Sequence, residues 1–455
     1  MSLVNTLIDR FEKNAPVAVM TRALFANILA PQDLDDIFKD CAERQYEGDL
    51  LFSTAVHLLA LAVTKQQPAL NSAYKQHQES IDVSVTALYA KLRGVELPVI
   101  RELVRRTAEK MAHIVGELSP ITEPLIPGYV TRILDGFHLA GTEHRIKETR
   151  TLNGAPLPGQ FLALLDPERR LIVDIYPCED GHAQERSILP QLIDDLKSGQ
   201  LWIMDRNFCT KVLLMEIKLN KAFFIVRHHA GMPLEMQGKR RHVGCIESGQ
   251  VYEQEAVIRD EFDSVLTVRC ITVQLNTPTD DGDTEIILLT NLPEEIAAED
   301  IAQAYRGRWT IERAFHELTL SLNGEIDTLT YPPAALLACA IAFVTYNVLS
   351  VVKTSIAHVH GAETRDTLST YYMASEVASV SEGMQIAIPS KEWKKKYEDL
   401  NAEQMAEALT GHAQHVNLKR YHKSRRGPKK PQPKRTGNKP HVSTARLLEA
   451  RQQRK

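Results

Sequence analysis

Paired cysteines are missing from this sequence. Its 455 residues include six cysteines, which are scattered and nowhere form a Cys-x2-Cys pair. Such pairs are typical of structural zinc sites, and dense, regularly spaced cysteines are typical of disulfide frameworks. The sequence therefore indicates neither of these, and it fits a reducing cytoplasm.

Long apolar runs are also scarce. The first residues lack a charged segment followed by an apolar run, so we expect no signal peptide. From Tyr331 to Val352 the chain carries no charge and is long enough to span a bilayer. Because this run contains Thr345, Asn347 and Ser350 and is rich in alanine, we interpret it as a helix buried in a large core. We expect no membrane partner.

The remaining composition is that of a globular protein. Hydrophobic residues make up 44% of the chain and charged residues 25%, which is ordinary for soluble proteins. A chain of 455 residues is too long for one simple core, so two to four domains are expected.

Positive charge is concentrated near the C-terminus. From Gly411 to Lys455 there are 14 Lys or Arg against Glu449 alone, a net charge of +13, so the rest of the chain carries −17 within the total of −4. A basic segment of this kind commonly contacts nucleic acid, and it is also typical of solvated disorder. The Pro- and Lys-rich run from Gly427 to Arg435 has a disordered composition. We expect residues 411–455 to form a basic, disordered tail.

Residues 1–125 are expected to form an all-helical domain, because amphipathic segments recur and none alternates as a strand does. Within it, Val83 to Gly94 reads as a helix that ends in a glycine turn, and a second helix follows near Pro98. This arrangement resembles a helix-turn-helix that contacts DNA. The second helix would carry three arginines, Arg101, Arg105 and Arg106. A plain helical bundle with basic surface residues explains the pattern equally well.

Residues 126–230 alternate strands with helices after a proline-marked linker. We predict strands at Val130–Leu139, Phe161–Leu165, Leu171–Tyr176, Leu201–Met204 and Ala222–Arg227, and helices at Gln184–Lys197 and Thr210–Leu219. Three consecutive strands, a helix and another strand are typical of a mixed sheet with helices packed on it.

Residues 231–293 read as a β-rich insertion, with strand-like runs separated by glycine-marked turns. The predicted strands are Val251–Val257, Ser264–Gln274 and Glu285–Leu289. Arg240 and Arg241 make the insertion basic, either for contact with a DNA backbone or as a solvated loop. Helices resume at residues 294–360, and residues 361–410 form a helical C-terminal region. We assign 126–230 and 294–360 to one α/β catalytic domain.

One stretch combines reactive side chains at helical spacing. From Tyr305 to Thr319 there is no proline and a single glycine, so we predict one helix. At about 100° per residue, Tyr305, Arg308, Glu312 and Thr319 lie on one face. A carboxylate can hold a divalent cation, and an arginine and a tyrosine can hold a phosphate. The alternative is the solvated face of an amphipathic helix.

Two aspartates, Asp135 and Asp205, stand at the ends of predicted strands. Neighbouring strands lie about 5 Å apart, so these carboxylates can converge. Glu312 would be a third if its helix packs beside the sheet. Three carboxylates suit a pair of divalent metal ions, which clamp the attacking and leaving oxygens of a phosphoryl transfer. Alternatively, each aspartate caps a turn or helix.

Together these residues resemble a known family. Asp135-Gly136, Asp205-Arg206-Asn207-Phe208 and Tyr305-x2-Arg308-x3-Glu312, in this order, are similar to the DDE transposases of bacterial insertion sequences. The closest resemblance is to the insertion-sequence-four family, which has a Tyr-Arg-Glu-Lys signature. The stretch from Glu179 to Ser187 adds a local match. The resemblance extends from about Pro127 to Lys353.

The resemblance implies a ribonuclease H-like catalytic fold with a β-rich insertion between the second aspartate and the glutamate. It implies that Asp135, Asp205 and Glu312 are catalytic and bind Mg²⁺, or Mn²⁺, and that Tyr305 and Arg308 contact phosphates at the transposon end. The implied partners are double-stranded DNA, as transposon ends and target, and a second copy of the chain in a homodimer on that DNA. The implied location is the bacterial cytoplasm, at the nucleoid.

The implied reaction is nicking of the transposon end, hairpin formation by the freed 3′-OH, hairpin opening and strand transfer into target DNA. Thr319 departs from the signature, because a lysine is expected there, and one phosphate contact is thereby weakened. All three tryptophans lie outside the insertion, where some relatives stack a flipped base, so strand cleavage is the firmer expectation. The alternatives are an inactive DNA-binding relative, such as an inhibitor or domesticated protein, and a structure-specific nuclease of the same superfamily.

Overall fold

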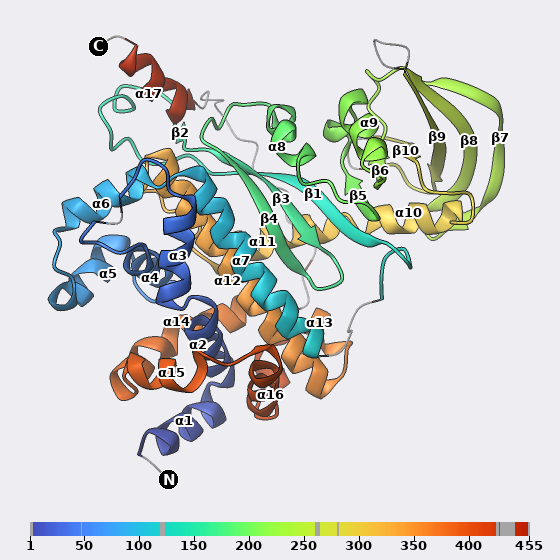
Figure 1. The fold of residues 1–455 in the computed structure, drawn as a ribbon. Coiled ribbons are helices and arrows are strands. Elements are labelled where there is room, and N and C mark those ends of the chain that lie inside the picture. The colour runs from blue at the N-terminus through green and yellow to red at the C-terminus, as the bar shows by residue number, and fades with distance from the viewer. Residues whose placement is uncertain are drawn as a thin grey trace.

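A mixed sheet of nine strands runs along the molecule and carries helices on both faces (Figure 1). In this computed structural model, the structure describes residues 3–46, 48–118, 123–259, 264–279, 282–424, 427 and 442–453. The strands of the sheet are β1 (Val130–His138), β3 (Gln160–Asp166), β4 (Leu171–Cys178), β5 (Gln200–Met204), β6 (Phe223–Arg227), β7 (Glu235–Ile246), β8 (Gly249–Arg259), β9 (Val265–Leu275) and β10 (Glu285–Thr290). Their spatial order is β4-β3-β1-β5-β6-β10-β9-β8-β7.

The first five strands form the mixed sheet expected for residues 126–230. β1 pairs antiparallel with β3, and β3 pairs antiparallel with β4. On its other side β1 pairs parallel with β5, which pairs parallel with β6. This confirms a mixed sheet core with helices, and it is consistent with a ribonuclease H-like fold.

Strand β3, which lies between β4 and β1, shows that this part of the sheet is covered on both faces. All seven of its residues are buried, and its sequence is nearly continuously apolar, as expected for a strand packed on two sides. Successive side chains of a strand point to opposite faces. Phe161, Ala163 and Leu165 belong to the core on the α12 side, whereas Leu162 and Leu164 belong to a second core on the other side.

The second core packs under short helices that connect the parallel strands. These are η2 (Glu185–Ile188), α8 (Leu189–Ile193), η3 (Arg206–Phe208) and α9 (Lys211–Leu219). The single helix predicted from Gln184 to Lys197 is wrong. Pro190 lacks a backbone N–H and is tolerated only in the first turn, so a new helix starts there after the 3₁₀ turn η2.

The helical body consists of segments from both ends of the chain. Those before the sheet are α1 (Leu3–Asn14), α2 (Pro16–Ile28), α3 (Pro31–Cys41), α4 (Phe52–Val63), α5 (Leu70–His77), η1 (Gln78–Ser80), α6 (Val85–Gly94) and α7 (Leu97–Glu117). Those after it are α12 (Pro332–His360), α13 (Thr364–Thr367), α14 (Thr370–Ala387), α15 (Ser390–Tyr397), α16 (Ala402–Ala413) and η4 (Leu418–Arg420). One hydrophobic core includes residues of both sets, so the two regions pack as one body rather than as separate domains.

Helix α12 is the centre of that body. It contacts α2, α4, α6, α7 and α16, and its residues from Ala334 to Ala357 are buried. The apolar run from Tyr331 to Val352 is therefore a core helix, as predicted. In the part of the chain that the structure describes, α12 is the one helix long and apolar enough to cross a membrane, and its apolar window is wholly buried in the protein.

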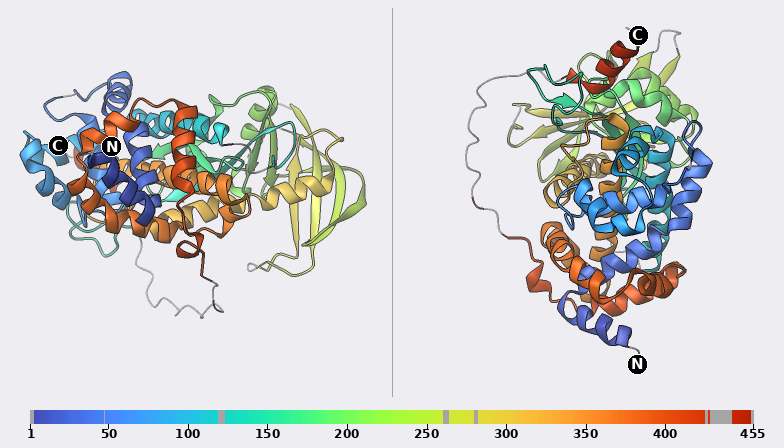
Figure 2. Two further views of the ribbon diagram at one scale, coloured as in Figure 1. Left: turned by 90° about the horizontal axis from the view of Figure 1, so that it is seen from below. Right: turned by 90° about the vertical axis from the view of Figure 1, so that its left-hand side faces the viewer.

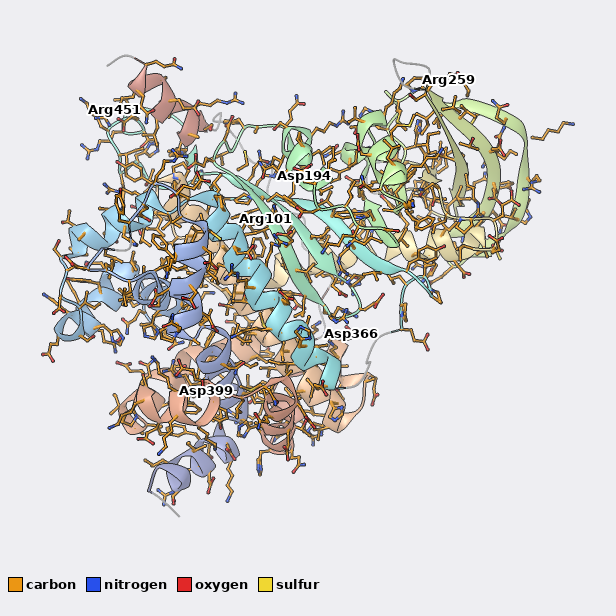
Figure 3. The ribbon with its side chains drawn as sticks, in the orientation of Figure 1. Arg101, Asp194, Arg259, Asp366, Asp399 and Arg451 are labelled. Carbon is orange, nitrogen blue, oxygen red and sulfur yellow. The ribbon has the colours of Figure 1, made fainter. Side chains whose placement is uncertain are left out.

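The helix-turn-helix interpretation does not fit α6 and α7. Helix α7, which carries Arg101 (Figure 3), packs on α12 and β4, and its arginines form ion pairs with carboxylates of this chain. Arg101 donates to Asp174 at 2.7 Å and also to Asp195, and Arg105 and Arg106 each pair with Glu102. The arginines of α7 are therefore paired with carboxylates of this chain, Arg101 in a largely covered position and Arg105 and Arg106 at the surface.

Strands β7–β10 extend the sheet rather than forming a sheet of their own, because β10 pairs antiparallel with β6. The helical body and strands β7–β9 lie at opposite ends of the molecule (Figures 1 and 2). Strand β7 was not predicted, because Gly238 and Gly244 indicated turns. Its pairing with β8 is irregular at both places: Gly238 has a positive φ of 65°, and β-bulges accommodate such residues within a strand.

The expected disordered tail is wrong in part. Within residues 411–455, β11 (Val442–Ser443) pairs parallel with β2 (Pro156–Leu157), and α17 (Thr444–Gln452) follows it. Arg446 and Arg451 of α17 form ion pairs with Asp180 and Glu148. The Pro- and Lys-rich run from 428 to 435 lies outside the described residues.

Candidate active site

The sheet brings Asp135 and Asp205 to neighbouring positions. Asp135 lies on β1, and Asp205 directly follows the last residue of β5. These strands are parallel, with Leu134 opposite Met204, so the next residue on each is one of the aspartates. Paired strands lie about 5 Å apart. The two carboxylates therefore start from adjacent positions of the sheet.

Glu185 of η2 lies next to Gly136, the residue that follows Asp135. The Gly136 N–H donates to Asp135 Oδ1 at 2.9 Å. A Cβ atom on Gly136 would meet the Glu185 carboxylate, so a larger residue at this position would displace that side chain. Glu185 Oε2 accepts a hydrogen bond from Asn207 Nδ2 at 3.4 Å. A fourth carboxylate thus stands beside the pair, and no role was predicted for it.

The stretch predicted as one helix is divided by a tight turn. Helix α10 (Ala298–Arg306) ends before Gly307, and α11 (Trp309–Ser321) begins after Arg308. The Gly307 N–H donates to the Ala304 carbonyl at 2.9 Å, and the Arg308 N–H donates to the Tyr305 carbonyl at 3.0 Å. These three-residue hydrogen bonds are those of a 3₁₀ turn, so the prediction of a single helix is wrong at this point.

At this turn Arg308 lies between two of the candidate carboxylates. Its Nη1 donates to Asp135 Oδ2 at 3.0 Å, and its Nη2 donates to Glu312 Oε1 at 2.6 Å. The Arg308 side chain is 9% exposed, that of Asp135 19% and that of Glu312 35%. Helix α11 packs on β1, which brings Glu312 to the sheet. Arg308 therefore links the helix to the first aspartate.

The pKa of Asp135 is raised by its surroundings. Burial raises it to about 7, and the charges of Glu312 and Asp205 add to the rise. Arg308 and the Gly136 N–H oppose the rise by favouring the carboxylate. Both other carboxylates thus lie near enough to repel Asp135, and Arg308 is the cation that holds the group together.

The environment of Arg308 is strongly acidic. Burial opposes its charge, yet the pKa of Arg308 is raised because Tyr305, Asp135, Glu312 and Asp205 surround it. Tyr305 is 7% exposed, and burial raises its pKa to about 12, so its phenol is neutral at pH 7. The Nε of Arg308 is buried and has no hydrogen-bond partner. This guanidinium therefore retains an unused donor.

The carboxylates of this site suit a divalent cation, although the Arg308 guanidinium lies between those of Asp135 and Glu312. Carboxylate oxygens are the ligands that Mg²⁺ and Mn²⁺ prefer. Among the described residues, no three Asp, Glu, His or Cys side chains are grouped closely enough to hold a metal ion. Arg308 accounts for this spacing, because it stands between Asp135 and Glu312. Cation binding would require it to release at least one of them.

Thr319 does not join this group. It lies seven residues after Glu312 on α11, a rise of about 10 Å along the helix. Its hydroxyl donates to the Phe315 carbonyl of the same helix at 2.9 Å. A hydroxyl satisfied in this way is a poor substitute for the charge of a lysine.

Arg240 and Arg241 also lie apart from the carboxylates. Both are exposed on β7, and four strands separate β7 from β5, a distance of roughly 24 Å. The Arg240 guanidinium stacks over the Tyr252 ring, with its Cζ 4.3 Å from the ring centroid, and lies 3.7 Å from Glu285. These residues form a separate basic edge.

Trp309 is a neighbour that the sequence did not assign to this site. It is 58% exposed, and the Arg308 Cζ lies 5.6 Å from its ring. Single exposed aromatic side chains are ordinary on protein surfaces, and an indole in this position can stack on a nucleobase. Its position next to Arg308 in the motif could have indicated from the sequence that Trp309 lies at this site.

Comparisons with known proteins bear on the class of protein. Residues 127–348 match the family model described as a transposase DDE domain, a range that includes Asp135, Asp205 and Glu312. The chain is also similar to a protein of Sinorhizobium fredii named "Putative transposase", with 35% identity over 124 residues, which are 26% of this chain and 33% of that protein. The chain thus spans about a third of the length of this relative. Both findings support a transposase function, and the subfamily and the roles of single residues stay predictions.

Proposed function

We propose that this protein is a DNA transposase of the insertion-sequence-four family. It cuts DNA at the terminal inverted repeats of its insertion sequence and joins the freed ends to target DNA. The proposed route is cut-and-paste transposition. The family resemblance implies that this route passes through a hairpin intermediate. The match over residues 127–348 supports the class of protein.

The observation that carries this proposal is the convergence around Arg308. Asp135 and Asp205 are at adjacent positions of parallel strands, and Glu312 is joined to Asp135 through one guanidinium. Carboxylates that repel one another raise the free energy of the folded state, and such clusters are typical of functional sites.

Each residue has a role in this proposal. Asp135, Asp205 and Glu312 would hold Mg²⁺ or Mn²⁺, which supplies Lewis acidity at the scissile phosphate and an activated oxygen nucleophile. Arg308, once released from a carboxylate, presents a guanidinium that can bind a phosphate through two hydrogen bonds. Tyr305 remains a neutral hydrogen-bond donor, because its pKa is about 12.

The substrate of the proposed reaction is double-stranded DNA. Trp309, exposed beside Arg308, can stack on a base that leaves the duplex. Lys239, Arg240 and Arg241 are exposed on β7 and can contact the DNA backbone further along. The proposal includes a homodimer on paired DNA ends, in the bacterial cytoplasm at the nucleoid.

Strand cleavage of the element's own terminal repeats, with Mg²⁺ or Mn²⁺ present, tests the function. We expect the full chain to nick these repeats and Asp205→Asn to lose at least about a thousandfold in rate while still binding them in a gel-shift assay. Asp194→Asn is the matched control, because Asp194 is exposed at the end of α8 (Figure 3). Cleavage by Asp205→Asn at the rate of Asp194→Asn would refute the proposal.

An inactive DNA-binding relative is the second candidate, favoured by two observations. Arg308 already forms hydrogen-bonded ion pairs with Asp135 and Glu312, and Thr319 stands where the family signature has a lysine. If the protein binds terminal repeats but cuts no DNA under any of these conditions, this candidate stands. A structure-specific nuclease of the same superfamily would instead cut branched DNA of unrelated sequence as fast as the repeats.

A further inference from the structure

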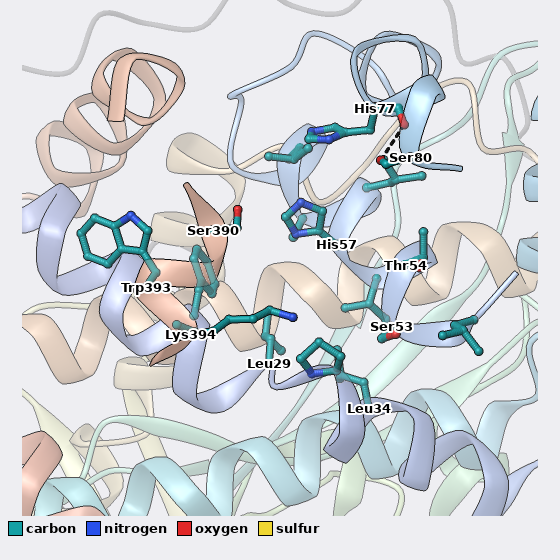
Figure 4. A pocket seen from close by; sticks show the side chains of 18 of the residues that line it. Leu29, Leu34, Ser53, Thr54, His57, His77, Ser80, Ser390, Trp393 and Lys394 are labelled. Atoms are coloured by element: carbon teal, nitrogen blue, oxygen red, sulfur yellow. Dashed lines mark hydrogen bonds between the residues drawn. The ribbon is translucent and has the colours of Figure 1, made fainter. Parts of the chain in front are cut away.

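A cavity in the helical body lies apart from the carboxylate site. It encloses about 450 Å³ between α2, α4, η1 and α15 (Figure 4). These helices form the end of the molecule opposite β7–β9 (Figure 1). Sites for small ligands are typically 300–1,000 Å³ in volume, so this cavity is of the usual size.

The lining of the cavity is apolar on its walls and cationic at its polar end. Most wall residues are aliphatic or aromatic, among them Phe25, Leu29, Leu34, Leu58 and Leu61. The charged or titratable lining residues are Arg22, His57, His77 and Lys394. Hydroxyl groups come from Ser53, Thr54, Ser80 and Ser390. No aspartate or glutamate is among the lining residues.

Arg22 is a partly buried cation that has no counter-ion among the described residues. Its Nη2 donates to Ser390 Oγ at 3.1 Å, and its buried Nε has no hydrogen-bond partner. None of the ion pairs among the described residues involves Arg22, and burial lowers its pKa. Isolated buried charges are costly unless a partner compensates them. A missing anion is the simplest account of this arrangement.

The two histidines add hydrogen-bonding groups without adding charge. Their rings pack edge to face with centroids 5.6 Å apart, and His77 Nε2 is buried without a partner. Burial lowers the pKa of His57 to about 4, so its ring is neutral at pH 7. The His57 side chain is exposed and is among the residues that line the cavity. In Figure 4 His57, Ser390 and Lys394 converge on the middle of the cavity.

We infer that this cavity binds a small anion that carries one carboxylate or phosphate group on an apolar body. The anionic group would pair with Arg22 and Lys394 and accept hydrogen bonds from the histidines and Ser390. The apolar body would pack on the aliphatic walls. This inference does not depend on the proposed transposase activity, because no residue of the cavity belongs to the carboxylate site.

Binding of the fluorescent anion anilinonaphthalene sulfonate to the full chain tests the inference. We expect one site, with the uncharged analogue phenylnaphthylamine binding at least about tenfold more weakly, because a charged hydrogen bond contributes about 1.5 kcal/mol or more. Arg22→Met should weaken binding of the anion about tenfold, and Arg22→Lys should restore part of it. Arg10→Met, which removes an exposed arginine of α1, is the matched control and should change nothing.

A second variant keeps the inference testable if Arg22→Met does not fold. Ala26→Phe places a ring in the cavity from the adjacent turn of α2, and it should abolish binding while the circular dichroism spectrum is kept. Competition then identifies the anionic group: decanoate displaces the dye if the site takes carboxylates, and adenosine monophosphate displaces it if the site takes phosphates. The inference is overturned if Arg22→Met and Ala26→Phe both bind the dye normally, or if only duplex DNA displaces it.

Discussion

Arg308 is buried and Arg22 is partly buried, and the two arginines differ in what surrounds them. Arg308 is held by Asp135 and Glu312 and lies near Asp205, and its pKa is raised. Arg22 has a serine hydroxyl as its partner, and its pKa is lowered by burial. One site has an excess of negative charge, and the other has an excess of positive charge.

This difference indicates which ligand each site lacks. An excess of carboxylates is relieved by a cation, and Arg308 supplies one from within the chain. An excess of buried positive charge is relieved by an anion, and no residue of the cavity supplies it. Removing each arginine should therefore change the stability of the protein in opposite directions.

The largest effect on stability is expected for Arg308→Met. It leaves Asp135 and Glu312 facing each other without a cation, and we expect the free energy of unfolding to fall by about 3 kcal/mol in metal-free buffer. Millimolar Mg²⁺ should restore part of this loss, because the vacated space is then open to a cation. Urea unfolding with and without Mg²⁺ measures both effects.

Arg259→Met is the control for that variant. Arg259 is exposed, and its Nε lies 3.0 Å from Glu235 Oε1, a surface ion pair worth less than about 1 kcal/mol (Figure 3). If Arg308→Met costs no more than Arg259→Met, or if Mg²⁺ stabilises both equally, the carboxylates do not form a cation site.

Glu317, which is paired with Lys353, is expected to give an effect on stability of intermediate size. Burial opposes ionisation of Glu317, but Lys353, the Thr370 hydroxyl and Lys423 together lower its pKa to about 2. A depressed carboxylate pKa stabilises the fold above the unfolded value of about 4.5, and this contribution is lost as the pH falls from there toward 2. Glu317→Gln should therefore cost on the order of 2 kcal/mol at pH 7 and much less near pH 2.

Unfolding of Glu317→Gln across this pH range checks the sign. Glu382→Gln is the matched control, because Glu382 is an exposed residue of the neighbouring helix α14. An equal cost of Glu317→Gln at both ends of the pH range would contradict the prediction, since a depressed pKa requires the cost to vanish in acid.

The effect of Arg22→Met should be smaller and of opposite sign. Replacing an uncompensated buried charge by an apolar side chain of similar length should raise the free energy of unfolding by about 1 kcal/mol without added ligand. Chemical denaturation of the ligand-free protein measures this. A loss of stability would mean that the cavity already neutralises Arg22.

The smallest effect on stability is expected at the basic edge. Arg240→Gln together with Arg241→Gln should change the free energy of unfolding by less than about 0.5 kcal/mol, because both side chains are exposed. Their effect should be on DNA binding, where the dependence of log Kd on log salt should fall by up to about two units. An unchanged salt dependence would exclude β7 from the DNA interface.

Local patterns predicted those parts of the fold that depend on nearby residues. The mixed sheet and the burial of α12 followed from strand and helix periodicity. Asp135 and Asp205 could be expected to converge, because each directly follows an apolar run in the sequence. The structure places Asp135 within β1 and Asp205 just after β5. Their adjacency depends on the parallel register of β1 and β5, which agrees with that expectation.

Features that depend on long-range packing could not be predicted in this way. Arg308 was expected to contact phosphate, and its ion pair with Asp135 spans 173 positions of the chain. The arginines of α7 suggested a DNA-binding face, because Asp174 and Asp195 are distant in sequence. The cavity around Arg22 combines residues near both ends of the described chain, so no local pattern indicated it.

The basic side chains of β7 have a consequence for how copies of the protein behave together. β7 is an edge of the nine-stranded sheet, and the first eight of its residues are exposed, so its unpaired backbone groups could template another strand. Lys239, Arg240 and Arg241 would bring like charges into register if two such edges met. Mutual repulsion of these edges therefore protects the protein against fibrous self-association, and a variant neutral at all three positions should aggregate on storage.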